Sequence, residues 1–376
     1  MELKKYRFDE VTINFDKRRV PLSGAQRERR PGKYRYYGAQ GIIDHIDDFI
    51  FDGTYLLIAE DGENLKSKKQ NIAQVVDGQF WVNNHAHVVQ GNELCDTRYL
   101  CYLLNSMDLS GYITGSAQPK LSQANLNAVT MFLPSIDEQK KIIEYLYTLD
   151  KKIVVNQRIN DNLYAQAKAI FDNYFINIDA IPAGWRKGNL LDIAHYLNGL
   201  AMQKFRPQGH EIGLPVLKIK ELRQGSCDDS SELCSLSIKP EYIIHNGDVI
   251  FSWSGSLLVD IWCGGTCGLN QHLFKVTSDI YDKWFYYLWT AHHLARFIAI
   301  AADKATTMGH IKREELAKAE VLIPCEEDYT SFNSIMQPIF ELIISNRIES
   351  RKLAALRDEL LPKLMTGEID VSDVQL

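Results

Sequence analysis

A dense run of basic side chains lies near the start of the chain, and its chemistry suits a polyanion. Its members are Arg18, Arg19, Arg27, Arg29, Arg30 and Lys33. Lysine and arginine neutralise phosphates, and the arginine fork can also donate two hydrogen bonds to the O6 and N7 atoms of guanine. Tyr36 and Tyr37 follow the run, where their rings either contact nucleic acid or pack into the core. The alternative for the basic run is an ordinary surface loop.

Two further segments, about 190 residues apart, mix hydroxyl groups, cations and a turn former just before a helical pattern. The first, residues 115–122, contains Lys120 and Ser122. The second, residues 306–313, contains Thr306, Thr307, His310, Lys312 and Arg313. Hydroxyls, backbone amides and cations together suit contacts with phosphates. The alternative interpretation is a solvated helix start.

The second half of the chain holds weaker candidates for nucleic-acid contacts. These are Gln203, Lys204, Arg206, Lys218, Lys220 and Arg223, with Trp253 and Ser254 on a turn flanked by glycine. The pairs Asn84–His85 and Gln271–His272 are interpreted as structural hydrogen-bonding pairs. No acidic residue accompanies them at metal-ligand spacing, so we expect no metal.

A long helix is the element around which these candidates are organised. Pro134 ends the preceding segment, and Ser135 with Glu138 fits a capping box that starts the helix. Apolar residues then recur at steps of four and three, the seam of a coiled coil. The seam consists of Ile142, Leu146, Leu149, Ile153, Asn156, Asn160, Leu163, Ala167, Ile170 and Tyr174.

The end of the chain supplies a partner with the same spacing. Its seam consists of Phe332, Ile335, Ile339, Leu342, Asn346, Glu349, Leu353, Leu356 and Leu360. Both seams are polar in the middle, and a buried asparagine is satisfied only opposite another polar group. An antiparallel pair therefore places Asn156 and Asn160 opposite Asn346 and Glu349. The alternative is two amphipathic helices that pack on separate cores.

The sequence also repeats itself. Residues 98–106 align with 283–291, and residues 115–134 align with 304–324. Short apolar runs at 55–60, 80–89, 215–220, 248–253 and 272–276 predict strands, and residues 97–107 and 282–300 predict helices. We predict two similar α+β domains with largely antiparallel sheets, at 1–134 and 179–325. Long helices follow them at 135–178 and 326–376, and their antiparallel coiled coil gives the molecule pseudo-two-fold symmetry.

Composition narrows the functional classes. The net charge of −6 leaves room for a local basic face. Seven cysteines without a CxxC pair predict reduced thiols, and no apolar run is long enough for a membrane span or a signal peptide, so we expect a cytoplasmic protein. The motifs [DN]PP[YF], GxGxxG and GxxxxGK[ST] are absent from the sequence. We therefore expect no catalysis by this chain.

The order of the segments, with several phrases along nearly the whole chain, resembles the specificity subunit of type I restriction-modification systems, called HsdS. The phrases occupy residues 32–62, 115–126, 133–142, 214–222, 306–316 and 356–371, and include GSAQPKLSQANL and LRDELLPKLMTGEIDV. The resemblance implies two target-recognition domains, each reading one half of a bipartite, asymmetric DNA site. The long helices then hold the domains apart as a spacer.

The resemblance also implies partners. Two methyltransferase subunits (HsdM-type) dock on the helices and methylate adenine, and two restriction subunits (HsdR-type) join to form the nuclease. S-adenosylmethionine, ATP and magnesium are then expected on the partners only, and no cofactor on this chain. Two other hypotheses stay open at this point: a coiled-coil scaffold that binds only proteins, and a stand-alone nuclease or methyltransferase, which the absent motifs disfavour.

Overall fold

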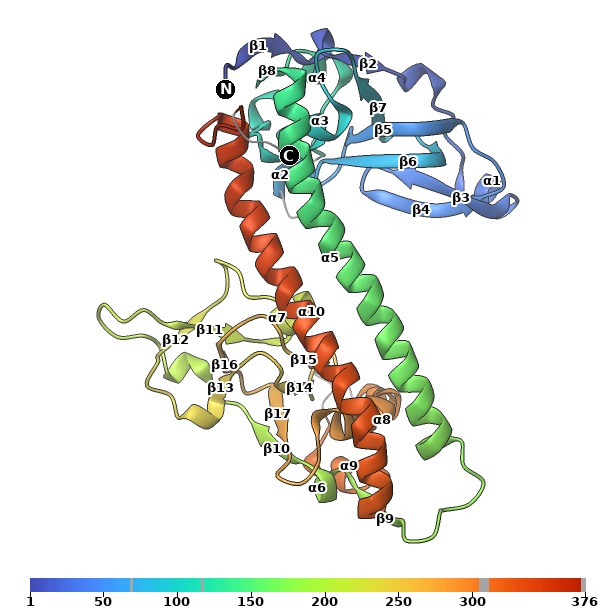
Figure 1. Ribbon diagram of the computed structural model, residues 1–376, viewed down its shortest axis with the longest axis vertical. Helices are drawn as coiled ribbons and strands as arrows, with labels where there is room; N and C mark the ends of the chain where they lie inside the picture. The colour runs from blue at the N-terminus through green and yellow to red at the C-terminus, as the bar shows by residue number, and fades with distance from the viewer. Residues whose placement is uncertain (68–69, 116–117, 304–310, 373–376) are drawn as a thin grey trace. The chain divides into compact units, whose positions relative to one another are not determined.

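The computed structural model describes residues 1–67, 70–115, 118–303 and 311–372, which form two compact units. The first unit comprises Met1–Lys151 and Ala354–Leu376, and the second comprises Lys152–Leu353. The long helices α5 (Ile136–Phe171) and α10 (Glu326–Thr366) each contribute one part to each unit (Figure 1). The domain boundaries predicted at residues 134, 178 and 325 stay predictions. No helix in the described ranges is both long and apolar enough to cross a bilayer.

The first unit is built on a six-stranded sheet in the order β2-β7-β5-β6-β3-β4. Neighbouring strands are antiparallel except β3 and β6, which are parallel. A second, two-stranded sheet joins β1 to β8. The elements are β1 (Lys4–Arg7), η1 (Phe8–Glu10), β2 (Thr12–Asn14), η2 (Asp16–Arg18), α1 (Gly24–Glu28), β3 (Pro31–Gly38), β4 (Gly41–Ile46), β5 (Phe51–Ala59), α2 (Asn64–Ser67), β6 (Ala73–Val82), β7 (Ala86–Gly91), α3 (Thr97–Ser106), η3 (Ser110–Tyr112), α4 (Gln123–Asn127) and β8 (Thr130–Leu133).

The main core of the first unit lies between the sheet, α3 and the two long helices. Ile142 and Leu146 near the start of α5 are fully buried in the same cluster as Leu364 near the end of α10. Arg357 of α10 donates to Asp150 of α5 at 2.7 Å. The start of α5 therefore meets the end of α10, as an antiparallel pair requires.

The second unit contains a four-stranded antiparallel sheet, β10-β17-β14-β15, and a mixed one, β12-β11-β16-β13. Strands β18 and β9 pair separately. The elements are η4 (Asp172–Ile176), β9 (Arg186–Asn189), α6 (Leu190–Ile193), β10 (His195–Asn198), η5 (Met202–Lys204), β11 (Leu214–Leu217), α7 (Ile219–Gln224), β12 (Leu233–Cys234), η6 (Pro240–Tyr242), β13 (Ile243–Ile244), β14 (Val249–Ser252), β15 (Leu258–Ile261), β16 (Cys267–Leu269), β17 (Leu273–Thr277), α8 (Lys283–Asp303), α9 (Arg313–Ala317) and β18 (Glu320–Ile323).

Aromatic side chains dominate the core of the second unit. Phe175, just after α5, packs against Trp185 and against Phe332 of α10, with ring centroids 5.2 Å and 5.1 Å away. The end of α5 therefore meets the start of α10. The predicted α+β class and the antiparallel pairing of the long helices are confirmed.

Both ends of α5 follow from local chemistry. The predicted capping box forms, because the Ser135 amide donates to Glu138 Oε2 at 2.9 Å and the Glu138 amide donates to Ser135 Oγ at 3.4 Å. At the other end the helix widens into the π-helical turn η4. That turn changes which side chains face inward, so Phe175 is buried and Tyr174 is 49% exposed. The prediction that Tyr174 ends the seam is wrong.

Two strand predictions are also corrected. The run at 80–89 is split into β6 and β7, because Asn83 Oδ1 accepts a hydrogen bond from the His85 amide at 2.8 Å and turns the chain. The run at 215–220 ends as a strand at Leu217, and α7 begins at Ile219. The predicted helices at 97–107 and 282–300 correspond to α3 and α8.

The seam of α10 differs from the predicted one on both sides of its polar centre. Ile335, Leu342 and Leu356 are between 44% and 52% exposed. Met336 and Phe340 are buried instead, and the ring of Phe340 packs against that of Tyr287 on α8, with the ring centroids 5.6 Å apart. Because α10 packs on a globular core as well as on α5, its buried face is broader than a coiled-coil seam.

The polar centre of the helix pair lies within the second unit and is joined by hydrogen bonds. Asn156 Nδ2 donates to Glu349 Oε2 at 2.7 Å, and Asn346 Nδ2 donates to Asn160 Oδ1 at 2.9 Å. Asn156, Asn160 and Asn346 are buried. The structure thus brings together the four polar seam residues.

Truncating one asparagine of this centre should destabilise the protein more than replacing two facing asparagines with leucine. We expect Asn160→Ala to lower the free energy of unfolding by about 1–3 kcal/mol, because it leaves the buried Asn346 amide without its acceptor. The double change Asn160→Leu with Asn346→Leu should recover most of that loss, since no unpaired polar group remains. Urea unfolding checks both, with the exposed Asn162→Ala as control. A double variant less stable than Asn160→Ala would contradict this account.

Candidate nucleic-acid interface

In the first unit, the predicted phosphate-binding loop is fixed to the end of β5. Thr114 and Lys120 exchange backbone hydrogen bonds at 2.9 and 2.8 Å, which closes the loop. Gly115 within it has φ +83°, and a Cβ there would lie 2.2 Å from the Gln118 carbonyl, so glycine is required. The Leu121 amide then donates to the Glu60 carbonyl at 2.8 Å. Residues 116–117 lie outside the described ranges.

A helix start follows directly. Ser122 has an extended backbone and its Oγ accepts a hydrogen bond from the Asn125 amide at 3.3 Å, so it is the N-cap of α4. Lys120 is exposed beside it, and its Nζ lies 3.3 Å from Glu60 Oε1. The loop therefore presents one cation and a short helix start at the end of the central strand.

A buried charged network lies beneath this loop. His87, at 1% exposure, contacts Asp16 Oδ2 through Nδ1 at 2.6 Å and the Leu121 carbonyl through Nε2 at 2.9 Å. Because both ring nitrogens face acceptors, the ring is satisfied only as an imidazolium. The guanidinium of Arg19 pairs with two carboxylates, that of Glu60 at 3.0 Å and that of Asp16 at 3.4 Å. The network thus joins η2, β5, β7 and the loop.

This network predicts a pH dependence of stability. Burial lowers the pKa of His87, but the hydrogen bonds to Asp16 and to the Leu121 carbonyl outweigh it, so the pKa is raised overall. A raised folded-state pKa gives stability that is fully present below the unfolded value of about 6.5 and is lost as pH rises through the folded pKa. We expect the first unit to become less stable in urea as pH rises above neutrality. The variant His87→Gln should lack that decline, and an unchanged slope would count against the imidazolium.

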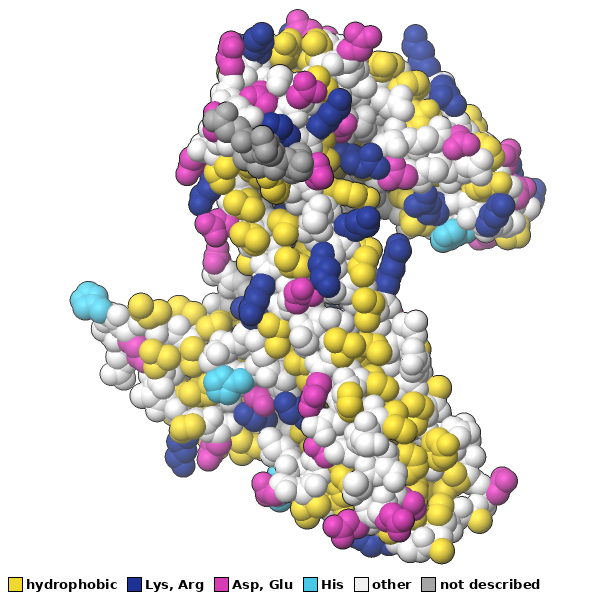
Figure 2. All heavy atoms as spheres, in the orientation of Figure 1, with side chains coloured by type: hydrophobic (Ala, Val, Ile, Leu, Met, Phe, Trp, Pro, Cys, Tyr) yellow, Lys and Arg dark blue, Asp and Glu magenta, His cyan; other side chains and the backbone are white. Residues whose placement is uncertain are grey.

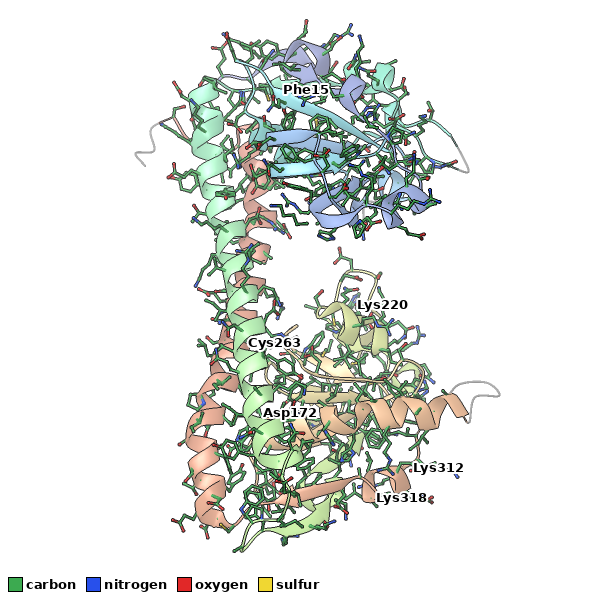
Figure 3. All side chains as sticks on the ribbon, turned by 90° about the vertical axis from the view of Figure 1, so that its right-hand side faces the viewer. Phe15, Asp172, Lys220, Cys263, Lys312 and Lys318 are labelled. Atoms are coloured by element: carbon green, nitrogen blue, oxygen red, sulfur yellow. The ribbon has the colours of Figure 1, made fainter. Side chains whose placement is uncertain are left out.

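The second unit repeats the same attachment. The Ile311 amide donates to the Trp253 carbonyl at 3.1 Å, directly after β14, and Lys312 is the extended N-cap residue of α9. Figure 3 shows Lys312 at one end of α9 and Lys318 at the other. Lys312 and Arg313 are exposed. Of the predicted site residues, Thr306, Thr307 and His310 lie outside the described ranges.

The turn beside each loop is repeated too. Asn270 Oδ1 accepts from the His272 amide at 3.2 Å, as Asn83 does from His85 in the first unit. The side chain of His85 pairs with Asp61 at 2.7 Å, and that of His272 contacts Ser254 Oγ at 2.9 Å. Both histidines thus have structural partners. The predicted pair Gln271–His272 is present at 3.3 Å, but His85 is bound by Asn83 and Asp61 and not by the predicted Asn84. Ser254 is buried at 5% exposure, so its hydroxyl is held within the unit.

The basic run of the first unit divides into exposed and paired residues. Arg29 and Lys33 are exposed near α1 and β3. Arg27 donates to Asp44 at 2.9 Å and Arg30 donates to Asp47 at 2.8 Å. On the face shown in Figure 2, Lys and Arg side chains of this unit lie among Asp and Glu side chains. This face is therefore mixed in charge, and Arg29 and Lys33 are exposed cations of the unit.

Four other predicted contact residues of the first unit make contacts within the unit. Arg18 donates to the Ile50 carbonyl at 2.7 Å and lies over the Phe51 ring. Arg19 belongs to the buried network. Tyr36 is fully buried with its hydroxyl accepting from the Leu22 amide at 2.8 Å, and Tyr37 is 4% exposed in the sheet core. The core interpretation of the two tyrosines is the one that the structure supports, because β3 pairs on both sides with β4 and β6.

The candidates of the second unit gather around η5 and α7. Gln203, Lys204 and Arg206 are exposed. Lys218 pairs with Glu232 at 2.6 Å, and Lys220 contacts Ser230 Oγ at 2.7 Å (Lys220 is labelled in Figure 3). The remaining candidates are Arg223, which is exposed, and Trp253, whose Nε1 donates to Asn198 Oδ1 at 2.9 Å.

Sequence reasoning missed the network residues Asp16, Glu60 and His87. One signal was present: His87 lies in an apolar strand, where a buried ring needs a partner for each nitrogen. The identity of those partners depends on strand pairing between distant segments, which the sequence pattern does not specify.

Comparison with known proteins adds the family. A model of the type I restriction modification DNA specificity domain matches residues 2–165 and again 182–356. The specificity subunit of the type I restriction enzyme MjaIX of Methanocaldococcus jannaschii is 28% identical over 307 residues, covering 74% of this chain and 70% of that protein. The specificity subunit of the HindI enzyme of Haemophilus influenzae is 19% identical over 422 residues, covering 90% and 89%.

A solved structure agrees in fold. The S subunit of a type I restriction-modification system from M. genitalium matches with a TM-score of 0.62 at 13% identity, over 97% of this chain and 96% of that one. At this identity the likeness supports the shared fold alone. The two family-model matches together span most of the chain, so it belongs to the family of type I restriction-modification DNA specificity subunits.

Proposed function

We propose that this chain reads a bipartite, asymmetric DNA site, one half with each globular unit. In each unit, the loop that ends at Leu121 or Ile311 and the helix start behind it contact the DNA backbone. Other exposed cations of each unit contribute to binding, Arg29 and Lys33 in the first unit and Arg206 and Arg223 in the second.

The observation that carries this proposal is the repeated attachment of the loop. In both units a backbone amide after the loop is bound to the carbonyl that follows the central strand, Glu60 in one and Trp253 in the other. A short helix starts immediately afterwards, at the N-caps Ser122 and Lys312. Helix starts and fixed cations bind phosphate oxygens and so position a protein on a duplex.

The long helices support a second part of the proposal, the docking of two methyltransferase subunits. Val155 and Ile159 of α5 are 38% and 39% exposed, and Leu342 of α10 is 46% exposed. Val155 and Ile159 stand one turn apart on α5, and contiguous exposed apolar side chains are typical of a protein interface. In the proposed complex, methyltransferase and restriction subunits supply catalysis and bind S-adenosylmethionine, ATP and magnesium, and this chain supplies sequence recognition in the cytoplasm.

The test is to map adenine methylation in cells that express the methyltransferase subunit of the same system with and without this chain. We expect a gapped, asymmetric motif that is methylated only when the chain is present. Lys120→Glu should reduce methylation through the first unit, and Lys312→Glu through the second. A complex that assembles but methylates no gapped motif would favour the protein-scaffold hypothesis and overturn the proposal.

A further inference from the structure

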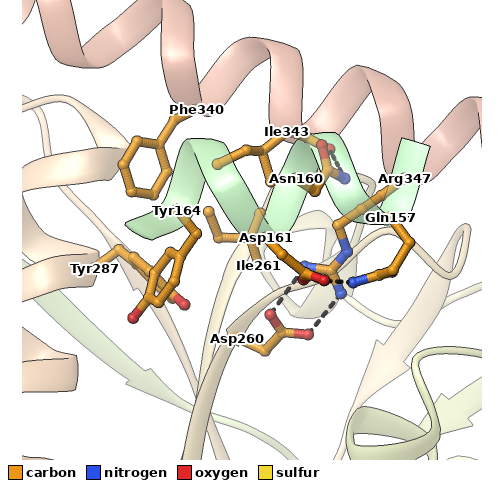
Figure 4. Close-up of a pocket in the computed structure, with 10 residues that line it drawn as sticks. All are labelled: Gln157, Asn160, Asp161, Tyr164, Asp260, Ile261, Tyr287, Phe340, Ile343 and Arg347. Atoms are coloured by element: carbon orange, nitrogen blue, oxygen red, sulfur yellow. Dashed lines mark hydrogen bonds and ion pairs between the residues drawn. The ribbon is translucent and has the colours of Figure 1, made fainter. Parts of the chain in front are cut away.

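A similar cavity occurs in each unit, bounded by corresponding elements of the repeat. In the second unit a cavity of about 260 Å³ lies between β15, α8, the end of α5 and the start of α10 (Figure 4). In the first unit a cavity of about 530 Å³ lies between β6, α3, the start of α5 and the end of α10. Strand β15 pairs with β14 as β6 pairs with β5.

One tyrosine occupies the same repeat position in both cavities. Residues 98–106 align with 283–291, and in this alignment Tyr102 of α3 corresponds to Tyr287 of α8. Each lines its cavity together with further aromatic rings, Tyr147 in the first unit and Tyr164 and Phe340 in the second. The cavities therefore share an aromatic wall carried by the first helix of each globular domain.

Both cavities also contain an arginine of α10 that is already bound to an aspartate. Arg347 donates through both guanidinium ends to Asp260, at 2.9 and 2.7 Å (Figure 4). Arg357 donates to Asp150 at 2.7 Å, and Asp150 also accepts from the Tyr102 hydroxyl. Each of these arginine charges is thus neutralised within its own cavity wall.

Carboxylates remain in excess once these pairs are counted. In the second unit Asp161 and Asp260 face one cation, Arg347. In the first unit the charged lining consists of Asp77, Asp150 and Asp358 with Arg98 and Arg357. Arg357 donates to Asp358 as well, at 2.7 Å, so two carboxylates share this one cation. Each lining therefore carries one negative charge more than positive charge. Aromatic rings and a surplus carboxylate are the groups that attract an ammonium or guanidinium ion.

We propose that each of the two cavities is a socket for a lysine or arginine side chain, one presented by each of the two docked methyltransferase subunits. This rests on the proposed function, because a duplicated chain offers a similar recess, with the same aromatic wall, to both copies of one partner. Arg98, 5.6 Å from the centroid of the Tyr147 ring, shows that a guanidinium already lies over an aromatic face of the first socket.

The first experiment uses the full chain and a small probe. We expect n-butylguanidinium to shift the ring signals of Tyr102 and Tyr287 in NMR spectra of tyrosine-labelled protein, and the neutral n-butanol to shift them far less. Asp358→Asn should weaken binding at least threefold at Tyr102 only, and Asp161→Asn at Tyr287 only. The exposed controls Glu28→Gln and Asp229→Asn should change neither. Equal shifts from butanol, or no response to either probe, would overturn the proposal.

The second experiment separates the socket from the function on which it rests. Binding of the methyltransferase subunit is measured first with the unchanged chain, then with Asp161→Asn and Asp358→Asn combined. No binding by the unchanged chain would count against the proposed function itself. Binding that the double variant weakens about tenfold or more, while Glu28→Gln with Asp229→Asn leaves it unchanged, supports the sockets. Equal binding by the double variant and the unchanged chain would refute the sockets alone.

Discussion

Replacing Asp16 with alanine is expected to lower the free energy of unfolding of the first unit by about 3–5 kcal/mol, the usual cost of breaking a buried ion pair. Asp16 is 8% exposed and accepts hydrogen bonds from His87 at 2.6 Å and from the Val88 amide at 2.8 Å. Arg19 lies 3.4 Å away. The alanine would leave the buried Val88 amide, the buried His87 ring and the partly buried Arg19 short of an acceptor.

The pKa of Asp16 agrees with this expectation. Burial alone would raise it, but the hydrogen bond from His87 and the charges of His87 and Arg19 outweigh burial and lower it. A lowered folded-state pKa means stability that is present above the unfolded value of about 3.9 and is lost as pH falls through the folded pKa. Between pH 5 and pH 3, Asp16→Ala should therefore lose less stability than the unchanged chain does, because the contribution of Asp16 is already absent.

The matched control is Asp9→Ala, a few residues earlier. Asp9 is exposed and pairs with the exposed Arg7 at 2.9 Å, so its loss should cost no more than about 1 kcal/mol. Urea unfolding followed by a signal from the first unit measures both variants. If Asp16→Ala and Asp9→Ala cost the same, the buried network does not hold this unit together.

The long helices could be predicted because their signals are local. A heptad seam and a capping box appear within a few residues, and the structure has the capping box at Ser135 and Glu138 as expected. The polar centre was predictable for the same reason, since Asn156 and Asn346 stand in the middle of otherwise apolar patterns. The exposure of individual side chains along α10 could not be predicted. Phe340 packs against Tyr287 of the globular domain, and a heptad pattern says nothing about contacts with that domain.

The candidate site divides in the same way. The loop before α4 could be found from its residue types and its repetition, and Ser122 is indeed a helix N-cap. Which arginines are exposed and which are paired could not be predicted from the sequence. Arg19, for example, is bound by Glu60, 41 residues away in sequence, and by the carbonyl of Ala86. Tyr36 similarly depends on the pairing of β3 with β6, which lies about 45 residues further along the chain. Such pairings are specified by the whole fold.

The largest expected effect on binding concerns the second unit. Reversing the charges of Lys312 and Arg313 to glutamate should weaken binding to the DNA site about 100-fold at low salt, if each contributes one charged contact worth about 1.5 kcal/mol. Both side chains are exposed at the start of α9. Because two phosphate contacts are lost, the slope of log affinity against log salt should become shallower by about 2.

Lys318→Glu supplies the matched control at the far end of the same short helix. Lys318 already pairs with Glu315 at 3.3 Å, so it has little charge to offer a phosphate, and its reversal should leave affinity within about threefold. Affinity is measured by titration of labelled DNA carrying the methylated motif, at several salt concentrations. A loss that is equal for the two variants would indicate a general charge effect. A loss confined to Lys312 and Arg313, with an unchanged salt slope, would mean that they contact bases and not phosphates, since only phosphate contacts release condensed ions.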